Sequence, residues 1–143
     1  SARESETRAF GDTPVVAKTE LCSMGLSVCY DLRFPELYRT LAHRGAEIVF
    51  VPSAFTAFTG KAHWDTLLRA RAIENQVYVI APNQFGKSPK SFATYGHSMI
   101  VDPWGNILGE LAEGPGLVMA EIDLAYLTKV RAELPALTHR KLF

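Results

Sequence analysis

Short apolar runs alternate with longer periodic segments along the first part of the chain. The runs MGLSVCY (24–30), EIVFV (47–51) and QVYVIA (76–81) have the length of buried strands. Between them, FPELYRTLAHRG (34–45) and KAHWDTLLRARAIEN (61–75) repeat apolar residues at helical spacing. This order of strands and helices predicts β-α-β units, and therefore an α/β fold with parallel strands in one sheet.

The rest of the chain predicts antiparallel strands and one short helix. A polar loop from Asn83 to Tyr95 leads to a hairpin over residues 97–111, in which HSMIV and ILGEL flank the turn DPWGN. The run LVMAEID (117–123) is typical of a last strand. Asp123 then stands where it can cap a helix from Leu124 to about Glu133.

Length and composition indicate one compact domain without excess charge. The chain has 143 residues, of which 48% are hydrophobic and 21% are charged, so a sizeable core is possible and disorder is disfavoured. Fifteen basic residues balance fifteen acidic ones, which argues against nucleic acid and against an anionic membrane as partners. The apolar runs are too short to cross a bilayer, and we find no signal segment.

The cysteine content indicates a reducing environment. The two cysteines, Cys22 and Cys29, do not make a disulfide framework of the secreted kind, and they lack the companion ligands of a metal site. We therefore expect a cytoplasmic protein in which Cys22 is an incidental surface thiol. A thiol switch that joins the two cysteines is an alternative, although their separation along a strand makes direct pairing awkward.

Cys29 is the candidate nucleophile. It is predicted at the carboxyl end of a strand and just before a helix, which is where open α/β sheets bind their ligands. Unpaired main-chain N–H groups there favour negative charge, and the N–H of Tyr30 is the natural first donor to an oxyanion. The alternative is that Cys29 is a small buried hydrophobic residue, as most free cysteines are. Asp31, Arg33 and Glu36 could equally form an ion-pair network that fixes the turn.

Three motifs make the chain similar to a known family. CYDLRFPELYR, VPSAFTAFTGKAHWDTLLRARAIENQVYVIAPNQFG and YGHSMIVDPWGNILGE, in this order, resemble the carbon–nitrogen hydrolase family, also called the nitrilase superfamily. The resemblance runs from about Arg3 to the C-terminus. It implies an αββα four-layer sandwich and a catalytic set of one glutamate, one lysine and one cysteine. It implies no cofactor.

The resemblance also assigns roles to five residues. Cys29 would attack the carbon of a terminal amide to form a thioester, and the Tyr30 N–H would share the oxyanion with the lysine. Arg33 would bind a carboxylate of the small-molecule substrate, which suits the rigid fork of a guanidinium. Phe55 and Thr59 would line the same pocket. Without the resemblance, Phe55 is expected in ordinary core packing and Thr59 as a turn hydroxyl before Gly60.

Two members of the family's catalytic set have no counterpart here. The family's glutamate and lysine precede its cysteine, and the upstream candidates in this chain are Glu4, Glu6, Lys18 and Glu20. Because Lys18 and Glu20 resemble a variable hairpin, we do not assign the roles to them. Residues 1–143 are therefore expected to form a partial domain, the C-terminal half of the sandwich, inactive alone and with one apolar sheet face uncovered.

The sequence leaves two kinds of function open, an amidase and a scaffold. The residues of the second motif resemble the deaminated-glutathione amidase branch more closely than the ω-amidase branch. Enzymes of both branches cleave a terminal amide of a carboxylate-bearing substrate. The rival is a non-catalytic assembly or scaffold chain with the same fold. Relatives associate through helices near residues 61–75, so a homo-oligomer is expected.

Arg69, Arg71 and Glu74 are expected on a solvated helix face with intrahelical ion pairs, and a subunit interface is the alternative. His63 has no second histidine at metal-ligand spacing, so no metal site is predicted. His97 is disfavoured as a base for Cys29 because nothing in the sequence would orient it.

Overall fold

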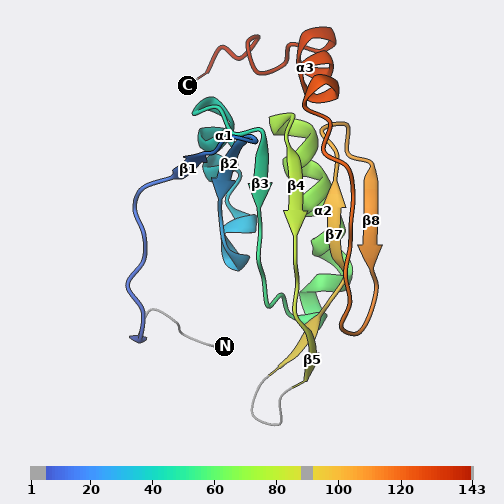
Figure 1. Ribbon diagram of the computed structural model, residues 1–143. Coiled ribbons are helices and arrows are strands. Elements are labelled where there is room, and N and C mark those ends of the chain that lie inside the picture. Colours follow the sequence, from blue (N-terminus) through green and yellow to red (C-terminus); the bar gives the residue numbers. More distant parts are fainter. Residues whose placement is uncertain (1–5, 88–91, 143) are drawn as a thin grey trace.

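A six-stranded mixed sheet forms the centre of the molecule (Figure 1). The computed structural model describes residues 6–87 and 92–142, so Glu4, the start of the predicted arm and part of the predicted polar loop lie outside the described residues. The strands, in their order across the sheet, are β1 (Val15–Lys18), β2 (Ser23–Leu26), β3 (Ile48–Phe50), β4 (Tyr78–Ala81), β7 (Ser98–Val101) and β8 (Ile107–Leu111).

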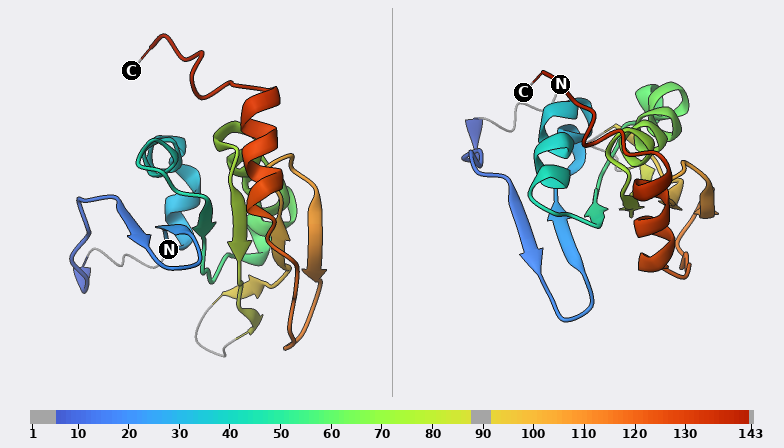
Figure 2. Two further views of the ribbon diagram at one scale, coloured as in Figure 1. Left: turned by 45° about the horizontal axis from the view of Figure 1, so that its top comes forward. Right: turned by 90° about the horizontal axis from the view of Figure 1, so that it is seen from above.

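The three strands β2, β3 and β4 are parallel, as the sequence predicts. They are joined by α1 (Pro35–His43) and α2 (Ala57–Asn75), which lie on the same side of the sheet (Figure 2). The N-terminal pair β1–β2 and the pair β7–β8 are antiparallel hairpins. The predicted β-α-β units and the predicted hairpin of residues 97–111 are therefore confirmed, and Lys18 lies in a hairpin strand.

The main core lies between the sheet and the two helices α1 and α2. Leu41 of α1, Val49 of β3, Trp64 and Leu68 of α2, and Val79 of β4 all have no exposed surface. Alternation along a strand sends neighbouring residues to the opposite face. The apolar stripe predicted on the second helix is thus confirmed at Trp64 and Leu68.

The opposite face of the sheet is covered in part by α3 (Leu124–Glu133). Leu127 of this helix packs on Ile48 and Tyr78, and the Asp123 side chain caps the helix by accepting a hydrogen bond from the Tyr126 N–H at 3.0 Å. Beyond α3 the face stays open in the described chain, since Leu26 is 46% exposed. In the part of the chain that the structure describes, no helix is both long and apolar enough to cross a membrane.

Helix α2 begins earlier than the sequence pattern predicts. The Thr56 side chain is its N-cap and accepts a hydrogen bond from the Thr59 N–H at 3.3 Å, so the helix predicted over residues 61–75 starts too late. Gly60 looks like a turn residue in the sequence but lies in the first turns of α2. A Cβ atom there would collide with the Tyr95 ring, so the glycine permits a close approach of helix and strand.

Two further predictions differ from the structure. The predicted strand of residues 117–123 is wrong, because this segment makes no strand pairing with any described residue. Its side chains alternate between exposed and partly buried, and Leu117 and Met119 are more than four-fifths exposed. The segment nevertheless passes the sheet without joining the hydrogen-bond ladder. The predicted polar loop of residues 83–95 contains a small antiparallel pair, β5 (Phe85–Lys87) and β6 (Ala93–Tyr95).

Candidate active site

The segment that carries Cys29 continues from the end of β2 at the carboxyl edge of the parallel strands. The Ser27 N–H donates to the Phe50 carbonyl at 3.1 Å and the Cys29 N–H donates to the Pro52 carbonyl at 2.9 Å, so the chain stays fixed to the segment after β3. Residues Cys29–Arg33 then form a short 3-10 helix. The predicted strand of residues 24–30 is therefore too long at its carboxyl end.

Cys29 itself has a left-handed main-chain conformation, with φ of 47°. This conformation is unfavourable for a residue with a Cβ atom and costs about 1–2 kcal/mol. The turn is fixed by Asp31, whose carboxylate accepts from the Val28 N–H at 2.9 Å and whose own N–H donates to the Val28 carbonyl at 3.0 Å. Cys29 is partly exposed, which contradicts the alternative of a fully buried hydrophobic residue.

The N–H of Tyr30, the residue after Cys29, has no acceptor within residues 6–87 and 92–142. Among the turn, loop and cap hydrogen bonds of the described residues, none uses it. The Tyr30 ring is 65% exposed and packs edge-on against Phe34, with the ring centroids 5.4 Å apart. Helix α1 begins only at Pro35, so the donors nearest to Cys29 belong to the 3-10 turn rather than to the N-terminus of the α-helix.

A buried tyrosine supports the segment before Cys29. The Tyr38 hydroxyl shares a hydrogen bond of 2.9 Å with the Ser27 hydroxyl, which in turn donates to the Phe50 carbonyl at 2.8 Å. Burial raises the pKa of Tyr38 to about 12, and the bond to Ser27 opposes that rise. Tyr38 therefore stays neutral at physiological pH and fixes the end of β2.

Arg71 holds the 3-10 turn from the other side. Its side chain is buried, with Nε and Nη2 donating to the Leu32 carbonyl at 3.2 and 2.8 Å and Nη1 at 2.9 Å from a carboxylate oxygen of Glu74. The guanidinium also lies over the Tyr38 ring, 5.5 Å from its centroid. The predicted solvated face is thus wrong for Arg71, although the ion pair within the helix is confirmed.

Arg33 lies against two residues from the segments after β3. Its guanidinium carbon is 5.2 Å from the centroid of the Phe55 ring, and its Nη1 is 3.3 Å from Nδ1 of His63. The alternative of an ion-pair network with Asp31 and Glu36 is not found: within the described residues, Arg33 has no carboxylate ion-pair partner. The structure therefore brings Arg33 and Phe55 together.

Phe55 and Thr59 both make structural contacts, and Phe55 also lies beside Arg33. Phe55 is 4% exposed and packs on Trp64 with ring centroids 5.0 Å apart, so it belongs to the core as well. Thr59 is partly exposed in the first turn of α2, and its hydroxyl is bonded to the Thr56 hydroxyl at 2.7 Å. It is a helical residue and not the turn residue that the sequence predicts.

Asn83 is a structural residue of this edge that sequence reasoning missed. It is buried, its side-chain oxygen accepts from the Phe55 N–H at 2.9 Å, and its side-chain nitrogen donates to the Gly96 carbonyl at 2.6 Å. It thereby ties the segments after β3 and β4 together. A single asparagine directly after a buried strand and Pro82 was the available signal.

His97 is oriented by neighbours other than Cys29. Its Nδ1 is bonded to the Tyr95 carbonyl at 2.8 Å, its ring stacks on the Tyr95 ring at 3.9 Å, and its carbonyl accepts from Trp64 Nε1 at 2.8 Å. No hydrogen bond between His97 and Cys29 is found in residues 6–87 and 92–142. The same residues contain no cluster of three potential metal ligands.

Cys22 and Cys29 are both free thiols, and they lie beyond opposite ends of β2. Cys22 is partly exposed like Cys29, and it packs against the cluster of Ile48, Tyr78 and Leu127. Burial, and then the charge of Glu47, raise the pKa of the Cys22 thiol. The arrangement offers no direct route to a disulfide between the two cysteines.

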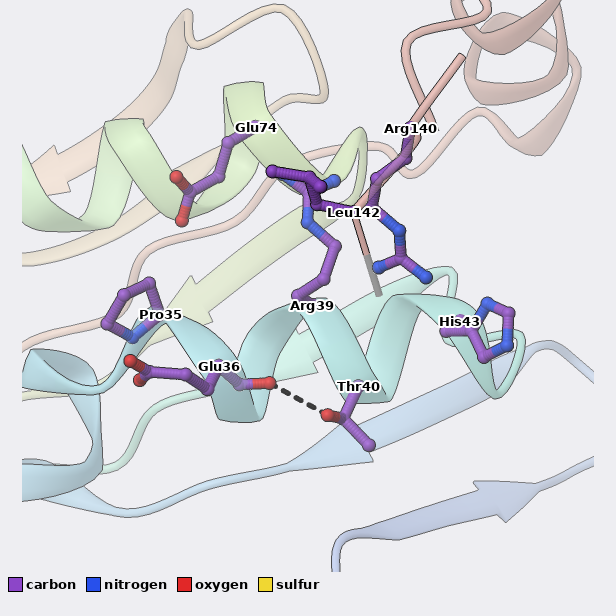
Figure 3. Close-up of a pocket in the computed structure, with 8 residues that line it drawn as sticks. All are labelled: Pro35, Glu36, Arg39, Thr40, His43, Glu74, Arg140 and Leu142. Atoms are coloured by element: carbon purple, nitrogen blue, oxygen red, sulfur yellow. Dashed lines mark hydrogen bonds between the residues drawn. The ribbon is translucent and has the colours of Figure 1, made fainter. Parts of the chain in front are cut away.

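A groove of about 500 Å³ lies elsewhere on the surface (Figure 3). It is bounded by α1, the end of α2 and the C-terminal segment, and its lining includes Arg39, His43, Glu74, Arg140 and Leu142. Glu74 is already paired with Arg71. The lining contains neither cysteine, so the groove is separate from the candidate site.

Comparison with known proteins gives consistent matches. Residues 1–132 match the sequence profile described as Carbon-nitrogen hydrolase. The "Deaminated glutathione amidase" of Synechocystis sp. (strain PCC 6803 / GT-S) is 55% identical over 127 residues, which are 89% of this chain and 47% of that protein. The chain spans about half the length of the curated relatives it matches.

Two solved structures have a similar fold. Nit3 of Saccharomyces cerevisiae, a member of branch 10 of the nitrilase superfamily, matches with a TM-score of 0.87 and 40% identity over 92% of this chain and 49% of its own. A mutant of the amidase from Nesterenkonia sp. AN1, with acrylamide added at the active site cysteine, matches with a TM-score of 0.77 and 36% identity over 94% of this chain and 53% of its own. The observed sheet and helices are thus a partial nitrilase-like α/β fold.

Proposed function

The chain belongs to the carbon–nitrogen hydrolase family, and from this premise we propose that Cys29 is the nucleophile of an amidase-type hydrolase. The observation that carries the proposal is the partly exposed thiol in a left-handed turn, at the carboxyl edge of three parallel strands. Such edges are where α/β sheets bind ligands. The unused Tyr30 N–H beside it supports a role in oxyanion binding.

The proposed reaction has two steps. The Cys29 sulfur, after losing its proton to a base, forms a bond to the carbon of a terminal amide, and the carbonyl oxygen becomes an oxyanion near the Tyr30 N–H. The C–N bond then breaks, the nitrogen takes up a proton, and ammonia leaves a thioester. Water attacks the thioester carbon, the C–S bond breaks, and the products are a carboxylate and the restored thiol.

The proposed substrate is a small molecule that carries a carboxylate besides its amide. The support is Arg33, whose charge no carboxylate neutralises within the described residues and whose guanidinium is steadied by Phe55. We propose that Thr59, in the first turn of α2, lines the same pocket. Relatives named deaminated glutathione amidase favour that substrate class over an ω-amidase substrate.

The general base and the oxyanion lysine are proposed to come from residues outside this chain. Within the described part, no carboxylate or lysine side chain is hydrogen-bonded to Cys29. Loss of a base and of an oxyanion donor each typically lowers the rate by about 10²- to 10³-fold or more. We accordingly propose that the 143 residues form a partial domain that is inactive alone. We also propose that the full-length protein is a cytoplasmic homo-oligomer.

Ammonia release with a panel of ω-amides tests the proposal. We expect hydrolysis by the full-length protein with deaminated glutathione as the preferred substrate, none after Cys29→Ser, and none by the isolated 143-residue chain. Turnover by the isolated chain near that of the full-length protein would contradict the account of the base and the lysine. Undiminished turnover after Cys29→Ser would contradict the nucleophile.

The second candidate function is a non-catalytic assembly chain of the same fold. It is favoured by the same lack of a base at Cys29 among the described residues. Iodoacetamide labelling of the full-length protein separates the two functions. An active-site thiol is expected to react faster than an ordinary thiol, whereas an assembly chain is expected to show no enhancement at Cys29.

A further inference from the structure

We propose that His63 is a positioning residue that sets the preference for carboxylate substrates by holding Arg33. The inference rests on the proposed function for the role of Arg33. The sequence alone suggests no function for His63, because no second histidine stands at metal-ligand spacing from it. The structure instead brings it to Arg33, thirty positions away along the chain.

The contact with Arg33 determines which ring nitrogen of His63 accepts a hydrogen bond. Nη1 of Arg33 is 3.3 Å from Nδ1 of His63, and a guanidinium nitrogen can only donate. Nδ1 therefore accepts, and a neutral ring carries its proton on Nε2. A neutral acceptor orients the arginine without cancelling its charge, whereas a carboxylate in the same place would compete with the substrate.

Arg33 is consequently held on two sides and left free on a third. The Phe55 ring lies under its guanidinium at 5.2 Å, and His63 binds one of its terminal nitrogens. Phe55 is itself fixed by packing on Trp64 and by the Asn83 side chain. Restricting a flexible side chain before binding reduces the entropy lost when a ligand binds, so the cost of binding an anion falls.

Helix α2 places His63 beside the other members of the site. His63 is four residues beyond Thr59, so the two side chains lie on one face of the helix, one turn apart. The start of the helix is fixed by the Thr56 cap. Arg33, Phe55 and His63 thus form one cluster, in which His63 is the exposed member and the other two are buried or partly buried.

The test compares two substrates and two conservative variants in the full-length protein. One substrate is a dicarboxylic acid monoamide, and the other is a neutral amide of the same chain length. We expect His63→Ala to raise KM for the monoamide about tenfold while kcat changes little, because one hydrogen bond to a charged group is lost. Hydrolysis of the neutral amide is expected to stay unchanged.

Rescue by amide side chains separates positioning from a general structural effect. Asparagine places its side-chain oxygen near the position of Nδ1, so His63→Asn is expected to restore KM for the monoamide. Glutamine resembles Nε2 instead, so His63→Gln is expected to behave like His63→Ala. Lys61→Ala, at an exposed position two residues earlier on α2, is the matched control and is expected to leave the ratio of the two KM values unchanged.

Glutarate binding, measured by calorimetry, keeps the inference separate from the proposed function. A tenfold weaker Kd for glutarate in His63→Ala, restored in His63→Asn, supports the inference even if no amide is hydrolysed. Normal hydrolysis with KM and Kd unchanged in His63→Ala overturns the inference and leaves the function standing. Equal losses on both substrates, or absence of both glutarate binding and hydrolysis in the unmodified protein, also overturn it.

Discussion

The guanidinium of Arg71 donates two hydrogen bonds to the main-chain carbonyl of Leu32, three residues beyond Cys29. The bonds measure 3.2 and 2.8 Å, and the arginine is 5% exposed. One buried side chain of α2 therefore fixes the 3-10 turn that presents the thiol. Stability and the geometry of the candidate site are coupled through this contact.

Replacing Arg71 by methionine is expected to destabilise the protein by about 2–4 kcal/mol, because the Leu32 carbonyl and Glu74 both lose their partner. Arg71→Lys is expected to recover only part, since an ammonium lacks the guanidinium fork. Denaturant unfolding measures both. Arg69→Ala on the same helix is the control, and it is expected to lower the free energy of unfolding less because the Arg69 side chain is 48% exposed. Equal losses of stability at the two positions would contradict the role of Arg71 in fixing the turn.

Stability is expected to fall at alkaline pH because of Tyr38. Its pKa is raised to about 12 in the folded protein, chiefly by burial, against an ordinary value of about 10. The neutral form is thus favoured by folding, so the stabilisation is complete below about pH 10 and is lost as pH rises through about 12. The loss amounts to about 2–3 kcal/mol.

Tyr38→Phe isolates this contribution. At pH 7 the variant is expected to be less stable by about 1 kcal/mol, because the bond to Ser27 is lost. Urea unfolding between pH 8 and 12 is expected to show the variant overtaking the unmodified protein as tyrosine ionisation begins to penalise only the latter. Parallel stability curves over this range would mean that Tyr38 ionises as easily in the folded chain as in the unfolded one.

Much of the fold follows from local patterns. Pro35 and Gly45 mark the ends of α1, and the apolar stripe of α2 predicts its buried face, because the spacing of apolar residues directly reflects which side is buried. The patterns fail where a distant partner decides. Gly60 lies inside a helix, where the Tyr95 ring comes too close for a larger residue. Residues 117–123 pair with no strand in the described part of the chain, despite their strand-like alternation.

The candidate site was predictable only in outline. Cys29, Phe55 and Asn83 follow successive parallel strands, so their meeting at one edge is a consequence of topology. The contacts that position Arg33 depend on His63, and periodicity does not reveal which polar side chain of a helix meets a residue from another segment. For the same reason the sequence predicts Arg71 on a solvated face, although its guanidinium is needed beneath the turn.

Gly60→Ala is expected to destabilise the protein even though alanine is the better helix former. The new Cβ would overlap Cγ of Tyr95, and such overpacking costs about 1–3 kcal/mol, against a gain of about 1 kcal/mol in helix propensity. Gly11→Ala is the control, because nothing lies within 4 Å of a Cβ there. A rise in melting temperature for Gly60→Ala would show that α2 can move away from the Tyr95 ring at little cost.

At Cys29, glycine is expected to be more stabilising than alanine, which reverses the usual order. The φ of 47° strains any residue with a Cβ atom, so Cys29→Gly is expected to exceed Cys29→Ala in unfolding free energy by about 1 kcal/mol. Ala125→Gly, at an exposed position of α3, is expected to show the ordinary order, with glycine less stable by about 1 kcal/mol. Denaturant unfolding of the three variants compares the two sites. If alanine is also the better residue at position 29, the turn relaxes to a negative φ without its cysteine, and the left-handed conformation is then not imposed by Asp31, Pro52 and Arg71 around it.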